Sequence, residues 1–334
     1  MKEPKNLLLT GGAGYIGSHL TWCAYEAGYR VAVLDRQATQ RAAFLPAQIR
    51  LIDGDLSNKE LICQILKEER IETVCHLAAS VLVNESVQYP LSYYHNNLSL
   101  SLGLIECCLK YEVQQFLFSS TGSIYGDGNR SEGATPSAQP VSPYARSKWM
   151  VEQVLQDIQG TQKSTAQPMK IAILRYFNVA GADPKMRTGS TGNTHLIDIG
   201  CEWALGMRDF IEIYGDQHPT PDGTCIRDFV HVSDVAQAHI DTIDYLKRQQ
   251  HHFFTADVGL GTGFSVREIL HCFTQLLDRS MDIRIAPPRP GDAAQNHADI
   301  QALSRTGWEP TITQLTQIIG TALQWARSTP QRRL

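Results

Sequence analysis

Residues 7–20 read LLLTGGAGYIGSHL, a short apolar run followed by a glycine cluster and then by a helix-like pattern. Gly11, Gly14 and Gly17 recur at three-residue intervals directly after the apolar run. Glycines at such a point permit a tight turn, close approach of a phosphate to the backbone, and close packing of helix on strand. The helix N-terminus then offers free N–H groups to an anion. The stretch therefore predicts a strand-turn-helix unit that holds a dinucleotide.

A second apolar run, VAVLD, ends at Asp35, eighteen residues beyond Gly17. A carboxylate at the end of the second strand accepts hydrogen bonds from the ribose hydroxyls of adenosine and repels a 2′-phosphate. A bare glycine-rich turn is also typical of an ordinary strand–helix junction. Strand, helix and terminal acid in register favour the dinucleotide, and Asp35 predicts NAD rather than NADP. Arg36 beside it weakens that preference.

Further apolar runs alternate with helix-length segments through the first half of the chain: QIRLID, ETVCHLA, QQFLFSS and MKIAILRYF. This alternation predicts βαβ units and an α/β fold with a doubly wound parallel sheet. The rhythm breaks after Asn178, where turn-rich segments begin. We expect a dinucleotide-binding domain over 1–177, rejoined by about 224–250, and a smaller discontinuous α/β domain from 178–223 and 251–334.

Composition narrows the range of partners. The chain has 334 residues, 43% of them hydrophobic, and a formal net charge of −4, which argues against a nucleic-acid partner. Its eight cysteines include no C-x-x-C pair, so we expect free thiols in a reducing compartment and no bound metal. No run approaches the roughly 18 apolar residues of a membrane span. These features predict a cytoplasmic protein without nucleic-acid or membrane partners.

The segment SPYARSKWMVEQVL places Tyr144 and Lys148 on one face of a predicted helix, with Ser142 as its cap. The spacing alone is typical of a solvated helix face. However, the run FLFSSTGSIYG delivers Thr121 to the carboxyl edge of the sheet, where doubly wound folds bind ligands. A phenol is a weak base at neutral pH, but a nearby ammonium and a cationic nicotinamide both favour the phenolate. We therefore predict Tyr144 as the proton-transfer group.

The sequence resembles the extended short-chain dehydrogenase/reductase family, and within it the UDP-glucose/UDP-galactose 4-epimerases. The resemblance runs nearly end to end, through TGGAGYIGSH, ESVQYPLSYYHNN, SSTGSIYG, SPYARSKWMVE, LRYFNVAGA, DGTCIRDFVHVSDVAQAH and RPGDAAQNHAD. It implies a Rossmann fold, bound NAD, and a UDP-sugar that is inverted at C4 by transient oxidation and hydride return. Segments 92–109 and 145–158 resemble the helices through which family members pair, which implies a homodimer.

The same resemblance implies residue roles. Tyr144 is the base, Lys148 bridges to the nicotinamide ribose, and Thr121 supplies a hydroxyl. Cofactor contacts are expected from Gly11, Gly14, Tyr15, Ile16, Gly17, Asp35, Asp55, Leu56, Asn97, Tyr144, Lys148 and Tyr176. Substrate contacts are expected from Thr121, Asn178, His195, Leu196, Tyr214, Arg227, Arg289, Asp292 and Asn296. Of these, Asn178, Arg227 and Arg289 are assigned to the diphosphate region and Asp292 to the uridine ribose. In isolation, the charged residues would be read as surface salt bridges, and Asp55 as a turn acid.

Some positions depart from the family pattern. Val81 stands where many members carry a lysine directed at the cofactor phosphates, which predicts weaker NAD retention. Asn296 stands where hexose-restricted members carry a tyrosine, so we expect UDP-N-acetylhexosamines as additional substrates. Neighbouring side chains that fill the gap, or a UDP-pentose substrate such as UDP-xylose or UDP-arabinose, are the alternatives. Asp198 replaces a common proline, and the loop RQATQRAAF after Asp35 is shorter than usual.

Three other functions are compatible with a nucleotide-sugar fold. A 4,6-dehydratase needs an acid pair beside the hydroxyl, and Thr121-Gly122-Ser123 offers no carboxylate. A net NAD-dependent nucleotide-sugar oxidoreductase would consume added cofactor. A non-enzymatic NAD-binding protein would not need an intact set of tyrosine, lysine and hydroxyl. The resemblance favours the epimerase over all three.

Overall fold

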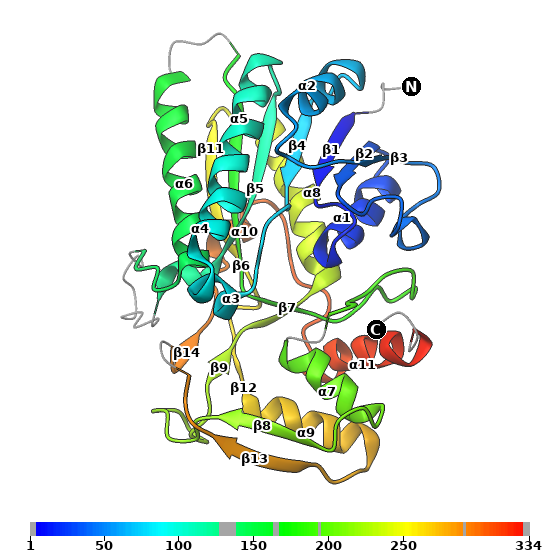
Figure 1. Cartoon of the computed structure of the whole chain (residues 1–334), viewed down its shortest axis with the longest axis vertical. Coiled ribbons are helices and arrows are strands. Elements are labelled where there is room, and N and C mark those ends of the chain that lie inside the picture. Colours follow the sequence, from blue (N-terminus) through cyan, green and yellow to red (C-terminus); the bar gives the residue numbers. More distant parts are fainter. Residues whose placement is uncertain (1–4, 127–137, 163–166, 193–194, 290–291, 330–334) are drawn as a thin grey trace.

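The computed structural model of the chain describes residues 5–126, 138–162, 167–192, 195–289 and 292–329 (Figure 1). Its centre is a seven-stranded parallel sheet with the order β11-β6-β5-β4-β1-β2-β3. The strands are β1 (Asn6–Thr10), β2 (Arg30–Asp35), β3 (Arg50–Asp53), β4 (Thr73–His76), β5 (Gln115–Thr121), β6 (Lys170–Tyr176) and β11 (Phe253–Val258). The strand order changes direction between β1 and β4, which confirms the predicted doubly wound Rossmann sheet.

Helices cover both faces of the sheet, so its strands are apolar on both sides. In β1, Leu7 and Leu9 pack into one apolar layer and Leu8 into the other. One layer is covered by α2 (Lys59–Glu68), α5 (Leu100–Lys110) and α6 (Pro143–Thr161). The opposite layer is covered by α1 (Tyr15–Glu26) and α8 (Val232–Arg248), as Figure 1 shows. The continuous apolar runs of the sequence therefore mark strands buried on both faces.

Local chemistry sets where the helices begin. Asn58 caps α2, and Ser142 caps α6 by accepting the N–H of Ala145 at 3.1 Å, with Pro143 in the first turn. Helix α1 differs, because its N-cap is Gly14 and no side chain caps it. The first turn of α1 also carries no acidic residue. The N–H groups at this end of α1 are therefore left for a ligand.

Short helical pieces connect the larger elements. They are η1 (Ala42–Phe44), α3 (Val83–Gln88), α4 (Pro90–Tyr93), η2 (Tyr94–Ser99) and η3 (Gly122–Tyr125). The piece η1 lies in the loop after β2, and η3 directly follows β5. These segments carry side chains to the carboxyl ends of the strands.

A smaller lobe lies at the carboxyl end of the sheet, in the lower part of Figure 1. Its strands are β7 (Asn178–Ala180), β8 (Phe210–Tyr214), β9 (Ile226–Arg227), β10 (Phe229–His231), β12 (Phe264–Ser265), β13 (Asp282–Ala286) and β14 (Gln295–Asn296). Its helices are α7 (Leu196–Ala204), α9 (Val266–Leu277) and α11 (Leu315–Ser328), whereas the short α10 (Gln301–Ser304) packs against β11 of the large sheet. Trp203 and Phe273 of this lobe belong to the same apolar cluster as Leu7 and Leu9 of the sheet. The two lobes therefore share one continuous core.

The segment 224–250, expected to rejoin the dinucleotide-binding domain, contributes a helix but no strand to the large sheet. Strand β10 pairs with β7, outside the large sheet, and only helix α8 of this segment covers the sheet. Strand β11 joins the sheet instead, beside β6, although the expected boundary at residue 251 precedes it. Strand β6 is already paired on both sides, with β5 and β11, so it has no open edge for β10. The domain boundaries themselves stay a prediction.

Candidate active site

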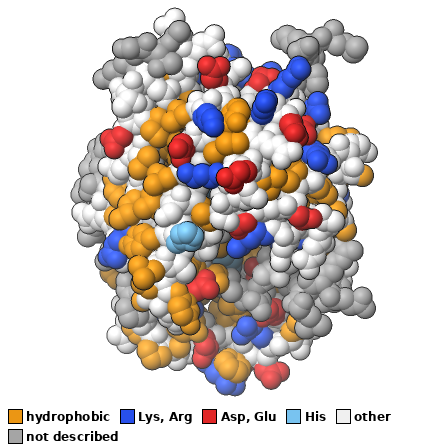
Figure 2. Space-filling model, turned by 45° about the horizontal axis from the view of Figure 1, so that its top comes forward, with side chains coloured by type: hydrophobic (Ala, Val, Ile, Leu, Met, Phe, Trp, Pro, Cys, Tyr) orange, Lys and Arg blue, Asp and Glu red, His pale blue; other side chains and the backbone are white. Residues whose placement is uncertain are grey.

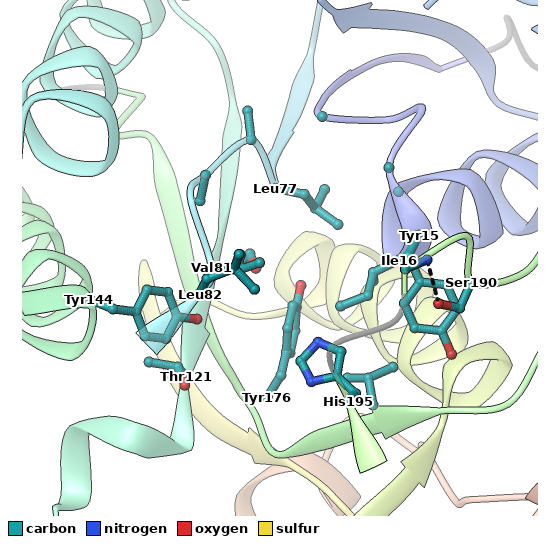
Figure 3. A pocket seen from close by; sticks show the side chains of 18 of the residues that line it. Tyr15, Ile16, Leu77, Val81, Leu82, Thr121, Tyr144, Tyr176, Ser190 and His195 are labelled. Atoms are coloured by element: carbon teal, nitrogen blue, oxygen red, sulfur yellow. Dashed lines mark hydrogen bonds between the residues drawn. The ribbon is translucent and has the colours of Figure 1, made fainter. Parts of the chain in front are cut away.

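A cavity of about 670 Å³ follows the carboxyl edge of the sheet. It extends from the glycine-rich turn between β1 and α1, past the ends of β5 and β6, to β14 and the start of α7. It brings together the predicted residues Gly11, Gly14, Tyr15, Ile16, Gly17, Asp35, Asp55, Leu56, Thr121, Tyr144, Lys148, Tyr176, Asn178, His195, Leu196 and Asn296. Figure 3 shows Tyr144 and Thr121 on one side, Tyr15 and Ser190 on the other, and Tyr176 and His195 between them.

The glycine-rich turn leaves room only for backbone. Gly11 has a φ of +70°, and a Cβ atom there would lie 2.7 Å from the backbone nitrogen of Ala78. A Cβ on Gly17 would lie 2.1 Å from the carbonyl oxygen of Gly11. Tyr15 turns its hydroxyl away and donates to the carbonyl of Gly181 at 2.7 Å. Together with the uncapped N-terminus of α1, this geometry fits a diphosphate.

Asp35 ends β2 at the rim of the same cavity. Its carboxylate accepts the backbone N–H of Ala13 at 3.2 Å and that of Gln37 at 3.0 Å, so its orientation is fixed. Asp55 lies nearby, where its carboxylate is 3.8 Å from the guanidinium of Arg36. The remaining acceptor capacity of Asp35 suits the two hydroxyls of a ribose.

The side chains of Tyr144 and Thr121 lie on the same side of the cavity (Figure 3). Thr121 ends β5, and its Oγ1 accepts the N–H of Ser123 at 3.1 Å. The Thr121 hydroxyl acts to lower the pKa of Tyr144. Burial has the larger effect and raises the pKa of Tyr144 above its ordinary value. The protein alone thus does not produce the lowered pKa that was expected from Lys148.

Lys148 lies one helical turn beyond Tyr144 and is 3% exposed. Its Nζ donates to the carbonyl of Ser119 at 2.9 Å and lies 4.9 Å from the centre of the Phe118 ring. Burial lowers the pKa of Lys148 to about 7, while the charge of Glu152 acts in the opposite direction. The charge of this lysine therefore depends on what shares the cavity with it at neutral pH.

Tyr176 is held in a fixed orientation at the end of β6. Its hydroxyl lies 2.6 Å from Nε2 of His239, and Nδ1 of the same ring lies 2.8 Å from the carbonyl of Val235. Because a carbonyl only accepts, Nδ1 carries the proton and Nε2 accepts the hydroxyl of Tyr176. Burial lowers the pKa of His239 to about 4, so this arrangement persists at neutral pH.

One predicted cofactor residue, Asn97, does not line the cavity. It is buried in η2, where its carbonyl oxygen accepts the N–H of Ser80 at 2.8 Å. Its amide nitrogen donates to the carbonyl of Ser80 at 2.9 Å and to the hydroxyl of Ser147 at 3.1 Å. Both amide donors are therefore used within the protein, and Asn97 anchors Ser80, the residue before Val81 in the cavity wall.

Four predicted substrate residues form a second group beyond Asn296. Arg227 lies opposite Asn296 in the pairing of β9 with β14, and its Nη2 is 3.5 Å from the carboxylate of Asp292. The guanidinium of Arg289 lies 3.8 Å from the centre of the Tyr214 ring. None of the four residues lines the cavity itself, but the group offers two guanidiniums and an aromatic face near Asn296.

Sequence reasoning missed several residues that line the cavity. Arg41 comes from the shortened loop after Asp35, and its Nη2 donates to the hydroxyl of Thr191 at 3.1 Å. Ser190 donates its hydroxyl to Asp198 at 3.0 Å, which gives that departure from the family pattern a structural partner in the first turn of α7. No local sequence motif predicts these contacts, because they join segments that lie far apart in the sequence.

The described residues hold eight free cysteines, and no group of at least three His, Cys, Asp or Glu side chains among them is placed to hold a metal ion. Within the same ranges, no helix is both long and apolar enough to cross a membrane.

The parallel sheet, the diphosphate cradle and the Tyr144–Lys148 pair define an enzyme of the dinucleotide-dependent Rossmann class. The model of the NAD dependent epimerase/dehydratase family matches residues 7–254, and the chain belongs to that family. The predicted resemblance and the predicted NAD are thereby confirmed.

Relatives and solved structures that match this chain over nearly its full length are named as UDP-sugar 4-epimerases. The UDP-glucose 4-epimerase of Azospirillum brasilense is 39% identical over 332 residues, covering 97% of this chain and 93% of that protein. A solved UDP-glucose-4-epimerase from Stenotrophomonas maltophila, with bound NAD and formylated UDP-arabinopyranose, superposes with a TM-score of 0.91 at 32% identity, covering 98% and 99% of the two chains. The UDP-Glc/GlcNAc 4-epimerase from Campylobacter jejuni superposes with a TM-score of 0.82 at 35% identity, covering 97% and 99%.

Proposed function

We propose that this chain is a UDP-sugar 4-epimerase that interconverts UDP-glucose and UDP-galactose with NAD. The observation that carries the proposal is the Tyr144–Thr121 hydroxyl pair beside the buried Lys148, midway along one continuous cavity. The glycine-rich turn and Asp35 lie at one end of that cavity, and Asn296 lies at the other. A hydroxyl at C4 of a bound sugar would meet the pair between them.

In this mechanism Tyr144 takes the proton of the sugar 4-hydroxyl, while the Thr121 hydroxyl holds the reacting oxygen. Bound NAD+ supplies the chemistry that the protein lacks, a hydride acceptor that returns the hydride to the opposite face of C4. Burial raises the pKa of Tyr144, and the positive charge of a bound nicotinamide would act against this effect. The Gly14 end of α1 would hold the cofactor diphosphate, and Asp35 the adenosine ribose.

Inversion requires that the sugar turns while the nucleotide stays fixed. Arg227, Arg289, Asp292 and Tyr214 offer charges and an aromatic face for the UDP portion, at a distance from the Tyr144–Thr121 pair. Tight binding of the UDP keeps the sugar in the cavity, while the hexose itself makes few contacts and stays free to turn. A 4-keto sugar tethered in this way can present either face to the cofactor.

The substrate range extends, in our proposal, to UDP-N-acetylglucosamine and UDP-N-acetylgalactosamine. Asn296 lines the cavity, and its Oδ1 is buried without a hydrogen-bond partner among the described residues. The N–H of an acetamido group would supply the missing donor. The name of the Campylobacter jejuni relative, a UDP-Glc/GlcNAc 4-epimerase, supports the same range. The pentose nucleotide in the Stenotrophomonas maltophila structure keeps UDP-pentoses as the alternative.

One assay separates these functions. Purified protein is given UDP-glucose, UDP-galactose, both N-acetylated UDP-hexosamines and UDP-xylose, and products are resolved by chromatography while absorbance is followed at the NADH band. An epimerase converts sugars with no net absorbance change, because the hydride is returned. Stoichiometric accumulation of NADH would identify a net oxidoreductase, and absence of turnover on every sugar would leave a binding protein.

We further propose that the chain forms a homodimer through α5 and α6. Exposed apolar side chains on or near these helices include Leu91, Leu102, Leu109, Val141 and Met150, and Leu91 is 82% exposed. Figure 2 shows apolar side chains gathered in a band down the left of the face drawn. Pairing this face with a second copy would remove that apolar surface from water.

A further inference from the structure

Arg41 closes one side of the cavity at its glycine-rich end. It lines the cavity together with Gly11, Gly14 and Asp35, and its Nη2 donates to the hydroxyl of Thr191 at 3.1 Å. These two residues belong to different lobes and lie 150 positions apart in the sequence. The contact therefore bridges the loop after β2 and the segment that leads into α7.

The partner segment crosses the N-terminal turns of α1. Tyr15 donates to the carbonyl of Gly181 at 2.7 Å, and the hydroxyls of Ser18 and Thr188 lie 2.7 Å apart. Figure 3 shows Ser190 beside Tyr15, at the end of α1 where the turn fits a diphosphate. Because Thr191 directly follows Ser190, it brings the Arg41 guanidinium to this end of the cavity.

Aromatic contacts support the Arg41–Thr191 hydrogen bond, which we call the clasp. The Arg41 guanidinium lies 5.8 Å from the centre of the Phe44 ring, which meets the Trp325 ring edge-on at 5.8 Å between centres. The indole N–H of Trp325 donates to the carbonyl of Ser190 at 2.9 Å. The chain of contacts thus returns to the residue before Thr191, so Arg41 is held in place before any ligand binds.

Arg41 differs from the other charged residues of the cavity wall in the partners that its side chain contacts. The acidic and basic residues of the wall are Asp35, Asp55, Asp198, Arg36, Arg41 and Lys148. Arg36 lies 3.8 Å from Asp55, and Lys148 is anchored on Ser119 at the catalytic end. Burial lowers the pKa of Arg41 and the charge of Asp35 acts in the opposite direction, yet among the described residues no ion pair within 4.0 Å joins Arg41 to a carboxylate. Its remaining N–H groups are available for an anionic ligand.

We propose that Arg41, held by Thr191 beside the N-terminal turns of α1, binds the diphosphate of the cofactor. The helix N-terminus and the guanidinium then share the two negative charges. The Arg41–Thr191 contact also spans the cavity, so a bound dinucleotide leaves only when the contact opens. Arg41 thus sets the rate of cofactor loss in a cavity whose neighbouring wall residue, Val81, carries no charge.

The test measures cofactor binding rather than epimerisation, so its outcome does not depend on the proposed substrate. NADH fluorescence titrations and the release rate of NAD+ from loaded protein are compared for the wild type, Arg41→Gln, Arg41→Lys and Thr191→Val. Loss of a charge-assisted hydrogen bond should raise the Kd of Arg41→Gln about ten- to hundredfold. Arg41→Lys should recover part of this loss, and Thr191→Val should speed release with a smaller change in Kd. Arg30→Gln removes an exposed charge that does not line the cavity and should change Kd less than about twofold.

Competition against NADH identifies the group that Arg41 contacts. ADP should lose most of its affinity in Arg41→Gln, whereas adenosine, which has no phosphate, should lose little. An equal loss for adenosine would place Arg41 on the base or ribose and overturn the assignment. A loss confined to 2′,5′-ADP would place it at the 2′-position and overturn it as well. Unchanged Kd and release rate in both Arg41 variants would refute the clasp.

Discussion

Glu152 lies one helical turn beyond Lys148, and its fully buried carboxylate pairs with the guanidinium of Arg175 at 2.6 Å. Ser120, next to Thr121 in β5, donates its hydroxyl to the same carboxylate. The pair therefore joins α6, which carries Tyr144, to β5 and β6, which form the cavity edge. This buried ion pair thus ties the helix that carries the proposed base to the strand that carries Thr121.

Removing only one partner of the Glu152–Arg175 ion pair should destabilise the protein. Arg175→Leu leaves the Glu152 carboxylate buried without a counter-charge, which should lower the free energy of unfolding by about 3–5 kcal/mol. Urea denaturation followed by circular dichroism measures the loss. The double variant Glu152→Leu with Arg175→Leu should lose less than Arg175→Leu alone, because no charge is then stranded. A single-variant loss below about 1 kcal/mol would contradict this account.

Removing the phenol hydroxyl tests the proposed base. Tyr144→Phe should fold and bind NADH, yet its kcat should fall about 10²–10⁴-fold, which is typical of the loss of a general acid–base group. Thr121→Ala should reduce kcat less, and the double variant should reduce it by less than the product of the two, since in the proposed mechanism both hydroxyls act on the same sugar oxygen. Arg146→Gln, an exposed change on the same helix, serves as the control. Wild-type turnover in Tyr144→Phe would remove this residue from the mechanism.

Substrate breadth should depend on Asn296. Asn296→Tyr fills the cavity wall with a larger ring and removes the amide oxygen that lacks a partner. Turnover of UDP-N-acetylgalactosamine relative to UDP-galactose should fall about tenfold or more, because a few kcal/mol of steric and hydrogen-bond energy separate the two sugars. Both kcat/KM values are measured on the same preparations. An unchanged ratio would show that another side chain selects the sugar.

Buried neutral histidines should make stability depend on pH. Burial lowers the pKa of His19, His231 and His239 to about 4 each, whereas a histidine in the unfolded chain titrates near 6.5. Above about pH 7 both states are neutral, so stability is fully present there. As the pH falls from 6.5 towards 4, the unfolded state takes up protons first, and stability declines. One such histidine contributes a loss of about 2 kcal/mol at pH 5.

Urea unfolding at pH 7.5, 6.5, 5.5 and 5.0 checks this slope. His239→Gln keeps a polar side chain at that position but cannot titrate, so its curve should be flatter than that of the wild type. His251→Gln changes an exposed histidine and should leave the slope unchanged. Stability that rises on acidification would contradict the assignment of these histidines as neutral.

The proposed dimer face is testable by charge insertion. Leu102→Glu places a carboxylate among the exposed apolar side chains of α5 and should give a monomer mass in light scattering. Leu276→Glu alters a similarly exposed leucine on α9 and should leave the mass unchanged. A wild-type mass equal to one chain at all concentrations would refute the dimer.

Local signals explain most of what the sequence predicts. The six apolar runs predicted as strands form β1 to β6, because a strand buried on both faces has to be apolar throughout. Tyr144 and Lys148 share one helix, so their spacing already determines their common face. Strand β11 was not predicted, because the sequence around its start, HHFF, is not a continuous apolar run. In the structure these residues are exposed or half-buried.

Long-range contacts explain the rest. Arg41 and Thr191 meet only after two lobes have folded together, and neither position carries a motif. Asn97 is a different case, because the cofactor contact that the family pattern implies for it stays a prediction. In the structure its amide N–H groups bond to Ser80 and Ser147, which the sequence does not indicate. Sequence spacing places residues along one element, but it does not show which hydrogen bonds the fold will use.

The late position of β11 in the chain also determines how the protein can fold during synthesis. While the ribosome has yet to deliver Phe253–Val258, the nascent sheet ends at β6, whose backbone N–H and C=O groups face an empty edge. An unprotected edge strand pairs readily with other chains, so nascent chains at this stage depend on chaperones or on rapid completion. A nonsense mutation ahead of residue 253 would therefore release an aggregation-prone fragment rather than a smaller working domain.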